Sequence, residues 1–181
     1  MRRVLRPFSH PFVPYLVSSE TITLPSGKCV LVPKCSYRFS PWRGKPIADT
    51  FGGKAVLSFR GRPVFAELAI LRVLQNTGWD GVWVDTFRRK FRRFLPPHKC
   101  QLPSDAQKVY EQICAANDGK MSGCFDVFAW RGKKLLFVES KRKGRDSIRP
   151  SQIRWLEAAL KSGIPLKAFL VCEWETRTQV S

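Results

Sequence analysis

Asp126, Glu139 and Lys141 are two carboxylates and an ammonium group within one short stretch of the chain, residues 124–141. Two apolar runs in this stretch flank Gly132-Lys133, a pair typical of the tight turn of a β-hairpin. With that pair as the turn, Asp126 lies opposite Glu139 on the neighbouring strand, with Cβ atoms roughly 4.5–5.5 Å apart. Lys141 lies two residues beyond Glu139 and therefore points to the same side of the sheet.

Two facing carboxylates need a compensating cation. Like charges opposite one another destabilise a sheet, so positive charge is expected beside this pair. Lys141 supplies one positive charge, and a divalent metal ion would supply more. Mg²⁺ prefers oxygen ligands, uses few carboxylates and keeps several waters. The pattern therefore predicts a site for Mg²⁺ or Mn²⁺, a cation that suits hydrolysis of a phosphodiester.

The residues around this constellation resemble a known family of nucleases. Asp126 followed by Glu139-x-Lys141 is the core of the PD-(D/E)xK pattern, and the flanking residues are similar to its VRR-NUC branch over about residues 63–174. The residues that carry the resemblance are Gly123, Asp126, Glu139, Lys141, Asp146 and Gln152-x-x-Trp155-Leu156. The chain departs from the family at Phe125, where proline is usual, and at Ser140, where an apolar residue is more common.

The resemblance implies a restriction-endonuclease-like α/β fold and a metal-dependent endonuclease that hydrolyses DNA. It also implies selectivity for branched or flapped DNA, and a homodimer, because small stand-alone relatives often pair to cut two strands. Asp126 and Glu139 would be direct metal ligands, and the backbone carbonyl of Ser140 would be another. Lys141 would orient the attacking water and stabilise negative charge. Gln152 would support the ligands or touch the water. Asp146 is expected to hold its loop rather than to act in catalysis.

Glu67 is a further candidate for catalysis and metal binding. It lies in a segment that is apolar nearly all round, and this pattern predicts a buried helix from Pro63 to about Asn76. A bare buried carboxylate is costly, so Glu67 either lies near the surface in the first turns or meets a cation. The family places a helix-borne glutamate upstream of the hairpin, which favours the metal.

Charge points to a polyanionic partner. The chain has 32 Lys and Arg against 14 Asp and Glu, a formal net charge of +18. Nucleic acid is the expected partner, because cations that neutralise phosphates release counterions. The block 87–94 interleaves arginines with aromatic residues, which suits a groove that binds phosphates and stacks on bases; if it continues the preceding strand, alternate cations share one face. The alternative is a solvated basic edge. The residues expected to bind nucleic acid are Arg88, Arg89, Lys90, Arg92, Arg93, Arg142, Lys143 and Arg145.

The chain divides into a basic, proline- and glycine-rich N-terminal extension (1–53), a nuclease domain (54–175) and a flexible tail (176–181). The extension is expected to be a loop or an arm, with a small hairpin from residues 21–24 and 28–32. The later elements alternate between helix and strand, which predicts a mixed central sheet flanked by helices, an α/β fold.

A cytoplasmic protein that does not enter a membrane is expected. No apolar run approaches the ~18 residues of a membrane span. The six cysteines show no C-x-x-C pair and are expected to be free thiols. Two other functions remain open: a catalytically silent basic module that binds nucleic acid with the same fold, and an RNA-processing nuclease.

Overall fold

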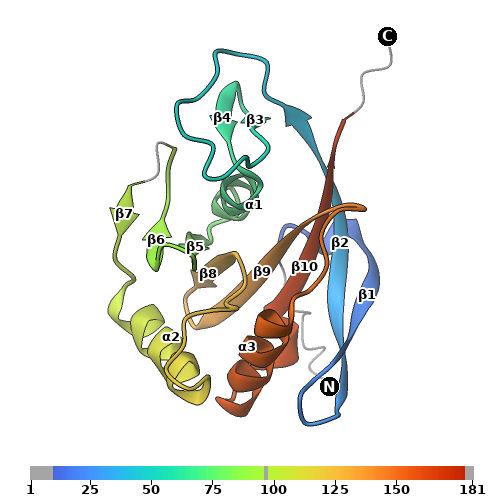
Figure 1. Cartoon of the computed structure of the whole chain (residues 1–181), viewed down its shortest axis with the longest axis vertical. Coiled ribbons are helices and arrows are strands. Elements are labelled where there is room, and N and C mark those ends of the chain that lie inside the picture. The colour runs from blue at the N-terminus through green and yellow to red at the C-terminus, as the bar shows by residue number, and fades with distance from the viewer. Residues whose placement is uncertain (1–9, 96–97, 178–181) are drawn as a thin grey trace, which may run out of the picture.

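The computed structural model describes residues 10–95 and 98–177. Within these ranges, ten strands form one mixed sheet, and three α-helices cover its two faces (Figure 1). The strand order is β4-β3-β2-β10-β9-β8-β5-β6-β7, and β1 pairs with β2 beside this path. The strands are β1 Leu16–Thr23, β2 Cys29–Pro41, β3 Leu57–Phe59, β4 Arg62–Val64, β5 Asp80–Asp85, β6 Lys90–Arg92, β7 Lys99–Cys100, β8 Val127–Arg131, β9 Lys134–Arg142 and β10 Phe169–Thr176. The α/β class and the mixed sheet predicted from the sequence are confirmed.

The hairpin of β8 and β9 is confirmed with the predicted register. Arg131 pairs with Lys134, and Phe128 pairs with Phe137. The rings of Phe128 and Phe137 stack with centroids 4.5 Å apart, and Phe137 stacks on Phe169 of β10 at 5.3 Å. Because aromatic cross-strand pairs stabilise one register over its neighbours, this ladder of rings fixes three strands in the centre of the sheet.

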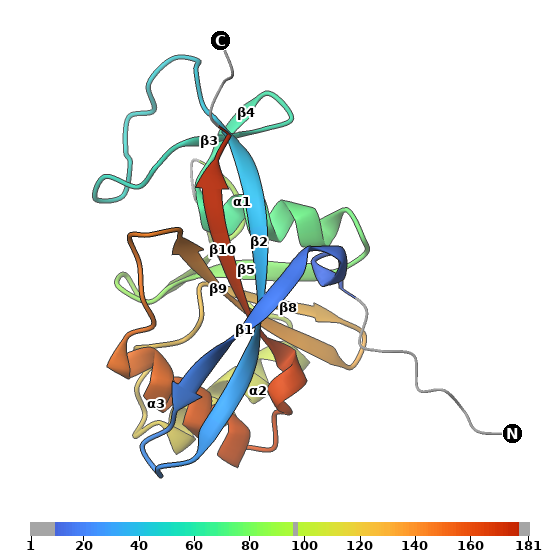
Figure 2. The same cartoon turned by 90° about the vertical axis from the view of Figure 1, so that its right-hand side faces the viewer.

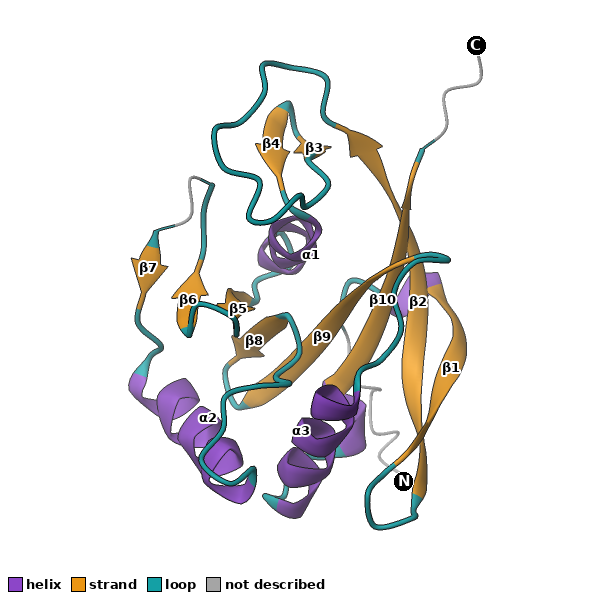
Figure 3. Cartoon of the chain, in the orientation of Figure 1, coloured by secondary structure: helices purple, strands orange, loops and turns teal. Residues whose placement is uncertain are grey.

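The helices divide between the two faces of the sheet (Figure 3). Helix α1 (Ala66–Gln75) packs on the face that carries Val127 and Val138. Helices α2 (Ser104–Ala116) and α3 (Pro150–Lys161) cover the face that carries the stacked phenylalanines. Alternation along each strand separates the two cores, since successive side chains of a strand point to opposite faces. Short 3₁₀ turns at Val13–Tyr15 and Leu166–Ala168 complete the elements.

Much of the predicted N-terminal extension belongs to the sheet. The small hairpin expected there is confirmed, and it extends from Leu16 paired with Cys35 to Thr23 paired with Cys29, so β1 pairs with the first half of β2. Strand β2 also pairs in parallel with β10, from Lys34 beside Val171 to Phe39 beside Thr176, and the two strands run side by side in Figure 2. Residues 16–41 therefore share one sheet with strands of the segment 54–175. The predicted tail lies outside the described residues from 178 onward.

Two further local predictions are wrong. Pro63 does not open helix α1; it pairs with Ser58 in the β3–β4 hairpin, and α1 starts at Ala66. The block 87–94 does not continue β5: the chain turns after Asp85 and returns as β6. Arg88 and Arg89 are therefore in a turn, so Arg88 does not share a strand face with Lys90 and Arg92 of β6.

Among the described residues, no helix has both the length and the apolar composition needed to cross a membrane.

Candidate functional site

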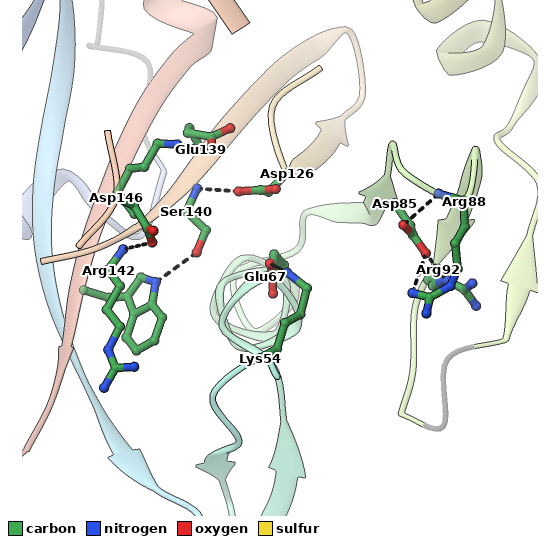
Figure 4. A network of polar contacts seen from close by, with 12 residues as sticks. Lys54, Glu67, Asp85, Arg88, Arg92, Asp126, Glu139, Ser140, Arg142 and Asp146 are labelled. Atoms are coloured by element: carbon green, nitrogen blue, oxygen red, sulfur yellow. Dashed lines mark hydrogen bonds and ion pairs between the residues drawn. The ribbon is translucent and has the colours of Figure 1, made fainter. Parts of the chain in front are cut away.

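A cleft of about 750 Å³ opens where the end of β5, the start of β8 and the end of β9 meet the first turns of α1 and α3. The loop before β3 and the loop after β9 form its walls. The structure brings all the predicted catalytic and metal-ligand residues to this cleft: they are Glu67, Asp126, Glu139, Ser140, Lys141 and Gln152. Side chains from α1, β9, α3 and the segment before β8 therefore converge on one cleft, as Figure 4 shows in part.

Asp126 is held at the entrance to β8 by backbone contacts. Its carbonyl oxygen accepts the N–H of Val84, and its Oδ2 atom accepts the N–H of Ser140 at 3.0 Å (Figure 4). The indole of Trp174 donates to the hydroxyl of Ser140 at 3.0 Å, which holds that residue in place. Burial raises the pKa of Asp126 well above its ordinary value, and the nearby charges of Glu139 and Glu67 raise it further.

Glu139 is the most deeply buried carboxylate of the cleft, with 1% of its surface exposed. Its Oε1 atom accepts from Gln152 at 2.6 Å and lies 2.9 Å from the ammonium nitrogen of Lys141. Its Oε2 atom receives no hydrogen bond from any described residue. Asp126 is adjacent, but a carboxyl group donates only when it is protonated. Burial raises the pKa of Glu139, while Lys141 and Gln152 act in the opposite direction.

Gln152 connects this pair to helix α3. Its Oε1 atom accepts the ammonium of Lys141 at 3.2 Å and the backbone N–H of Arg149 at 2.9 Å. The second contact caps the first turn of α3, so the orientation of the amide is fixed at the helix start. The Gln152 amide therefore accepts a hydrogen bond from Lys141 and donates one to Glu139. These two contacts fix the positions of both side chains.

Gly123 allows the segment before β8 to approach α3. Its φ is +92°, and a Cβ atom added there would lie 2.0 Å from the carbonyl oxygen of Ser151. A glycine is needed for two reasons: the left-handed backbone and the absence of space. The Ser151 carbonyl belongs to the peptide bond that leads into Gln152, so this approach sets the distance between Gln152 and the segment that precedes Asp126.

We expect Gly123→Ala to lower the free energy of unfolding by about 1–3 kcal/mol, because the methyl group must push the start of α3 away. The midpoint of urea unfolding measures the loss. Gly144→Ala is the matched control: its φ is +69°, but nothing lies within 4 Å of the added Cβ atom. Equal losses in the two variants would show that backbone strain, and not the contact with Ser151, explains the need for glycine.

Glu67 is buried in the first turn of α1 and meets a cation, as one of the two sequence alternatives required. The cation is Lys54, which comes from the loop before β3 and forms an ion pair with Glu67 (Figure 4). Burial alone would lower the pKa of Lys54, but the charges of Glu67, Asp126 and Asp85 raise it above its ordinary value. Lys54 was not predicted from the sequence, because nothing local indicates that its loop folds over α1.

The predicted nucleic-acid-binding residues differ in their availability. Arg92 is buried, and its Nε atom donates to Asp85 at 2.9 Å, so it supports the turn rather than the exposed basic surface. Arg93 is paired with Asp80 at 3.1 Å. Lys143 lies 3.5 Å from Glu175. Lys143 is nevertheless exposed, as are Arg88, Arg89, Lys90 and Arg145, although Arg88 lies 3.7 Å from Asp85. Arg142 is half-buried and lines the cleft.

Asp146 holds the loop after β9, the role expected for it. Its Oδ2 atom accepts the N–H of Arg142 at 2.9 Å (Figure 4), and the guanidinium of Arg142 lies 5.6 Å from the centre of the Trp174 ring. Arg142, Arg145 and Arg149 also line the cleft. This wall therefore places positive charge beside the carboxylates.

The donor set fits a divalent cation held by two carboxylates. Within residues 10–95 and 98–177, no group of three or more His, Cys, Asp and Glu side chains is arranged to hold a metal ion. Mg²⁺, however, is commonly bound by one or two carboxylates together with waters and substrate phosphates. Asp126 and Glu139 supply such a pair, and the unsatisfied Oε2 atom of Glu139 is a free ligand position. Glu67 is turned to Lys54 and is not needed for this set.

Comparison of the chain with protein-family models, with curated proteins and with solved structures gives no match. The family resemblance therefore rests on the residues of the chain alone.

Proposed function

We propose that this protein is a metal-dependent nuclease that hydrolyses phosphodiester bonds of DNA. The observation that carries the proposal is the adjacent pair of half-buried Asp126 and buried Glu139, in which the Oε2 atom of Glu139 lacks a hydrogen-bond donor among the described residues. A site that leaves a buried acceptor unsatisfied loses stability, and such groups cluster where a ligand supplies the missing partner. A divalent cation would bind the unsatisfied Oε2 atom of Glu139, and its positive charge would offset the two carboxylates.

The chemistry follows from what each group can do. A bound divalent cation neutralises charge on the phosphate and makes water a better nucleophile. The water oxygen forms a bond to phosphorus, the bond to one ester oxygen breaks, and that oxygen takes a proton to leave as a hydroxyl end. Lys141 stabilises the negative charge that develops on the phosphate. Hydrogen bonds with the Gln152 amide hold the side chains of Glu139 and Lys141 in position, and the Ser140 N–H holds that of Asp126.

A second candidate is a catalytically silent module that binds nucleic acid. The internal pairing of the site favours it, because Lys141 neutralises Glu139 and Lys54 neutralises Glu67 without a metal ion. The net charge of +18 supports either function. Either candidate function would operate in a compartment where thiols stay reduced, such as the cytoplasm, and the six free cysteines support that part of the proposal.

Cleavage of labelled DNA and RNA by the purified full chain, with Mg²⁺, Mn²⁺ or a chelator, tests the proposal. We expect cleavage of DNA only with a divalent cation, and Glu139→Gln should lower the rate by about 100-fold or more. Binding of DNA by Glu139→Gln, measured with the chelator, should differ little from binding by the wild type, because the variant keeps the overall basic charge.

Glu111→Gln, an exposed carboxylate on α2 outside the cleft, is the matched control and should cleave as the wild type does. Strong binding without cleavage of any substrate would assign the silent module instead. Faster cleavage of RNA than of DNA would assign RNA processing. Equal cleavage by Glu139→Gln and the wild type would refute the proposed site.

A further inference from the structure

The tip of the turn between β5 and β6 carries the most exposed large apolar side chain among the described residues. Phe87 is 91% exposed, whereas Val17 is 63%, Leu31 is 60% and Phe94 is 52% exposed. A phenylalanine that buries almost none of its ring contributes little to folding. Its position therefore needs another explanation, and one is contact with a partner.

The turn that presents Phe87 is fixed by contacts on its other residues. Asp85 accepts the backbone N–H of Arg88 at 3.2 Å through Oδ1 and the Nε atom of Arg92 at 2.9 Å through Oδ2 (Figure 4). The guanidinium of Arg88 lies 4.0 Å from the centre of the Phe51 ring. Arg89 has a φ of +53°, a conformation that persists only where the surrounding contacts determine it. These contacts fix the backbone of the turn, and the turn exposes the Phe87 side chain to solvent.

The surroundings of Phe87 indicate the chemistry of its partner. Phe87 and Arg88 line the same cleft as Asp126 and Glu139. Arg89 and Lys90, next along the turn, are exposed. An aromatic face flanked by cations matches a nucleotide, since the ring stacks on the base while the cations contact phosphates. The net charge of +18 favours this partner over a protein surface.

We propose that Phe87 is a stacking platform for an unpaired nucleobase next to the phosphate that enters the cleft. The proposal rests on the proposed nuclease function and adds to it a recognition residue: Phe87 would select nucleic acid that has an unpaired base beside the bond that is cut. In an uninterrupted duplex each base face is covered by its neighbours, so Phe87 would gain no contact unless a base is unstacked first.

Fluorescence of a short single-stranded oligonucleotide that contains 2-aminopurine, with a chelator present and salt fixed, tests stacking without cleavage. Stacking on Phe87 should quench the fluorescence, and the single strand should bind more tightly than its duplex. Phe87→Ala should remove the quenching and weaken single-strand binding by about tenfold, with little change for the duplex. Phe87→Trp should restore both properties.

Tyr15→Ala is the matched control, because Tyr15 is also an exposed aromatic residue but lies outside the block 87–94 and does not line the cleft; it should bind as the wild type does. Unchanged single-strand affinity of Phe87→Ala would overturn the proposal and would leave a protein partner as the explanation for the exposed ring. An equal loss for single strand and duplex would also overturn it, in favour of a wedge inserted into duplex DNA. Cleavage by the wild type with Mn²⁺ is measured separately, so failure of the nuclease function is distinguishable from failure of the stacking site.

Discussion

Asp126→Asn is expected to stabilise the protein in metal-free buffer and to abolish cleavage. Asp126 is half-buried beside Glu139 in the cleft, and loss of solvent and the neighbouring charge both raise its pKa. Asparagine removes that charge, keeps an oxygen to accept the N–H of Ser140, and brings an N–H₂ group that can donate to the unsatisfied Oε2 atom of Glu139. The melting temperature should rise by roughly 3–8 °C, the effect of satisfying one buried charged acceptor in a domain of this size.

The same variant should not be stabilised by Mn²⁺, because it lacks one of the two charged ligands. Melting curves of the wild type and Asp126→Asn, with a chelator and with Mn²⁺, measure both effects. Asp118→Asn is the control, since Asp118 is an exposed carboxylate in a turn outside the cleft. A lower melting temperature for Asp126→Asn in the chelator would contradict the view that the apo site is under charge repulsion.

The pH dependence of this difference is a further expected result. A carboxyl group with a raised pKa in the folded state binds its proton more tightly than in the unfolded chain, where its pKa is about 3.9. The contribution of Asp126 to stability therefore falls as pH rises from about 4 through the folded pKa. The melting temperatures of wild type and Asp126→Asn should be close near pH 4 and should separate toward neutral pH. A constant difference across this range would exclude titration of Asp126 as the cause.

The local parts of the site were predictable because short-range patterns determine them. The turn at Gly132-Lys133 and the alternation on both sides fix the hairpin and its register, and these place Glu139 and Lys141 on one strand side. Gln152 was predictable in the same way, because Pro150 marks the start of α3 and the apolar stripe orients the helix. Each of these inferences needed only residues close together in sequence.

The parts that were missed depend on contacts between distant segments. Strand β2 pairs with β10, more than a hundred residues later, and neither strand carries a signal that identifies its partner. The ion pair of Lys54 with Glu67 depends on a loop that crosses over α1. Asp85 ends β5 and organises the turn beneath Phe87, a role that depends on contacts with Arg88 and Arg92. A rare acidic residue among apolar neighbours was the available signal for Asp85, as it was for Glu67.

Lys54→Met is expected to have opposite effects on stability and on metal binding. Without its ammonium group, Glu67 becomes a buried carboxylate with no ion-pair partner in the cleft, and the free energy of unfolding should fall by roughly 1–3 kcal/mol. The lower part of this range is expected, because about a third of the Lys54 side chain is exposed and water screens the pair. Glu67→Gln together with Lys54→Met should recover most of the loss, since the double variant leaves no unpaired charge at this position.

Metal binding should become tighter in Lys54→Met. The charge of Lys54 acts on Asp126 as well as on Glu67, so it opposes any cation that approaches the carboxylate pair. Removal of one positive charge at this distance should lower the Mn²⁺ concentration needed for half-maximal stabilisation by about tenfold, equivalent to ~1.4 kcal/mol. Lys28→Met, which removes an exposed cation outside the cleft, should leave that concentration unchanged. If Lys54→Met needs as much Mn²⁺ as the wild type, the ammonium does not compete with the cation, and its role is confined to holding the loop on α1.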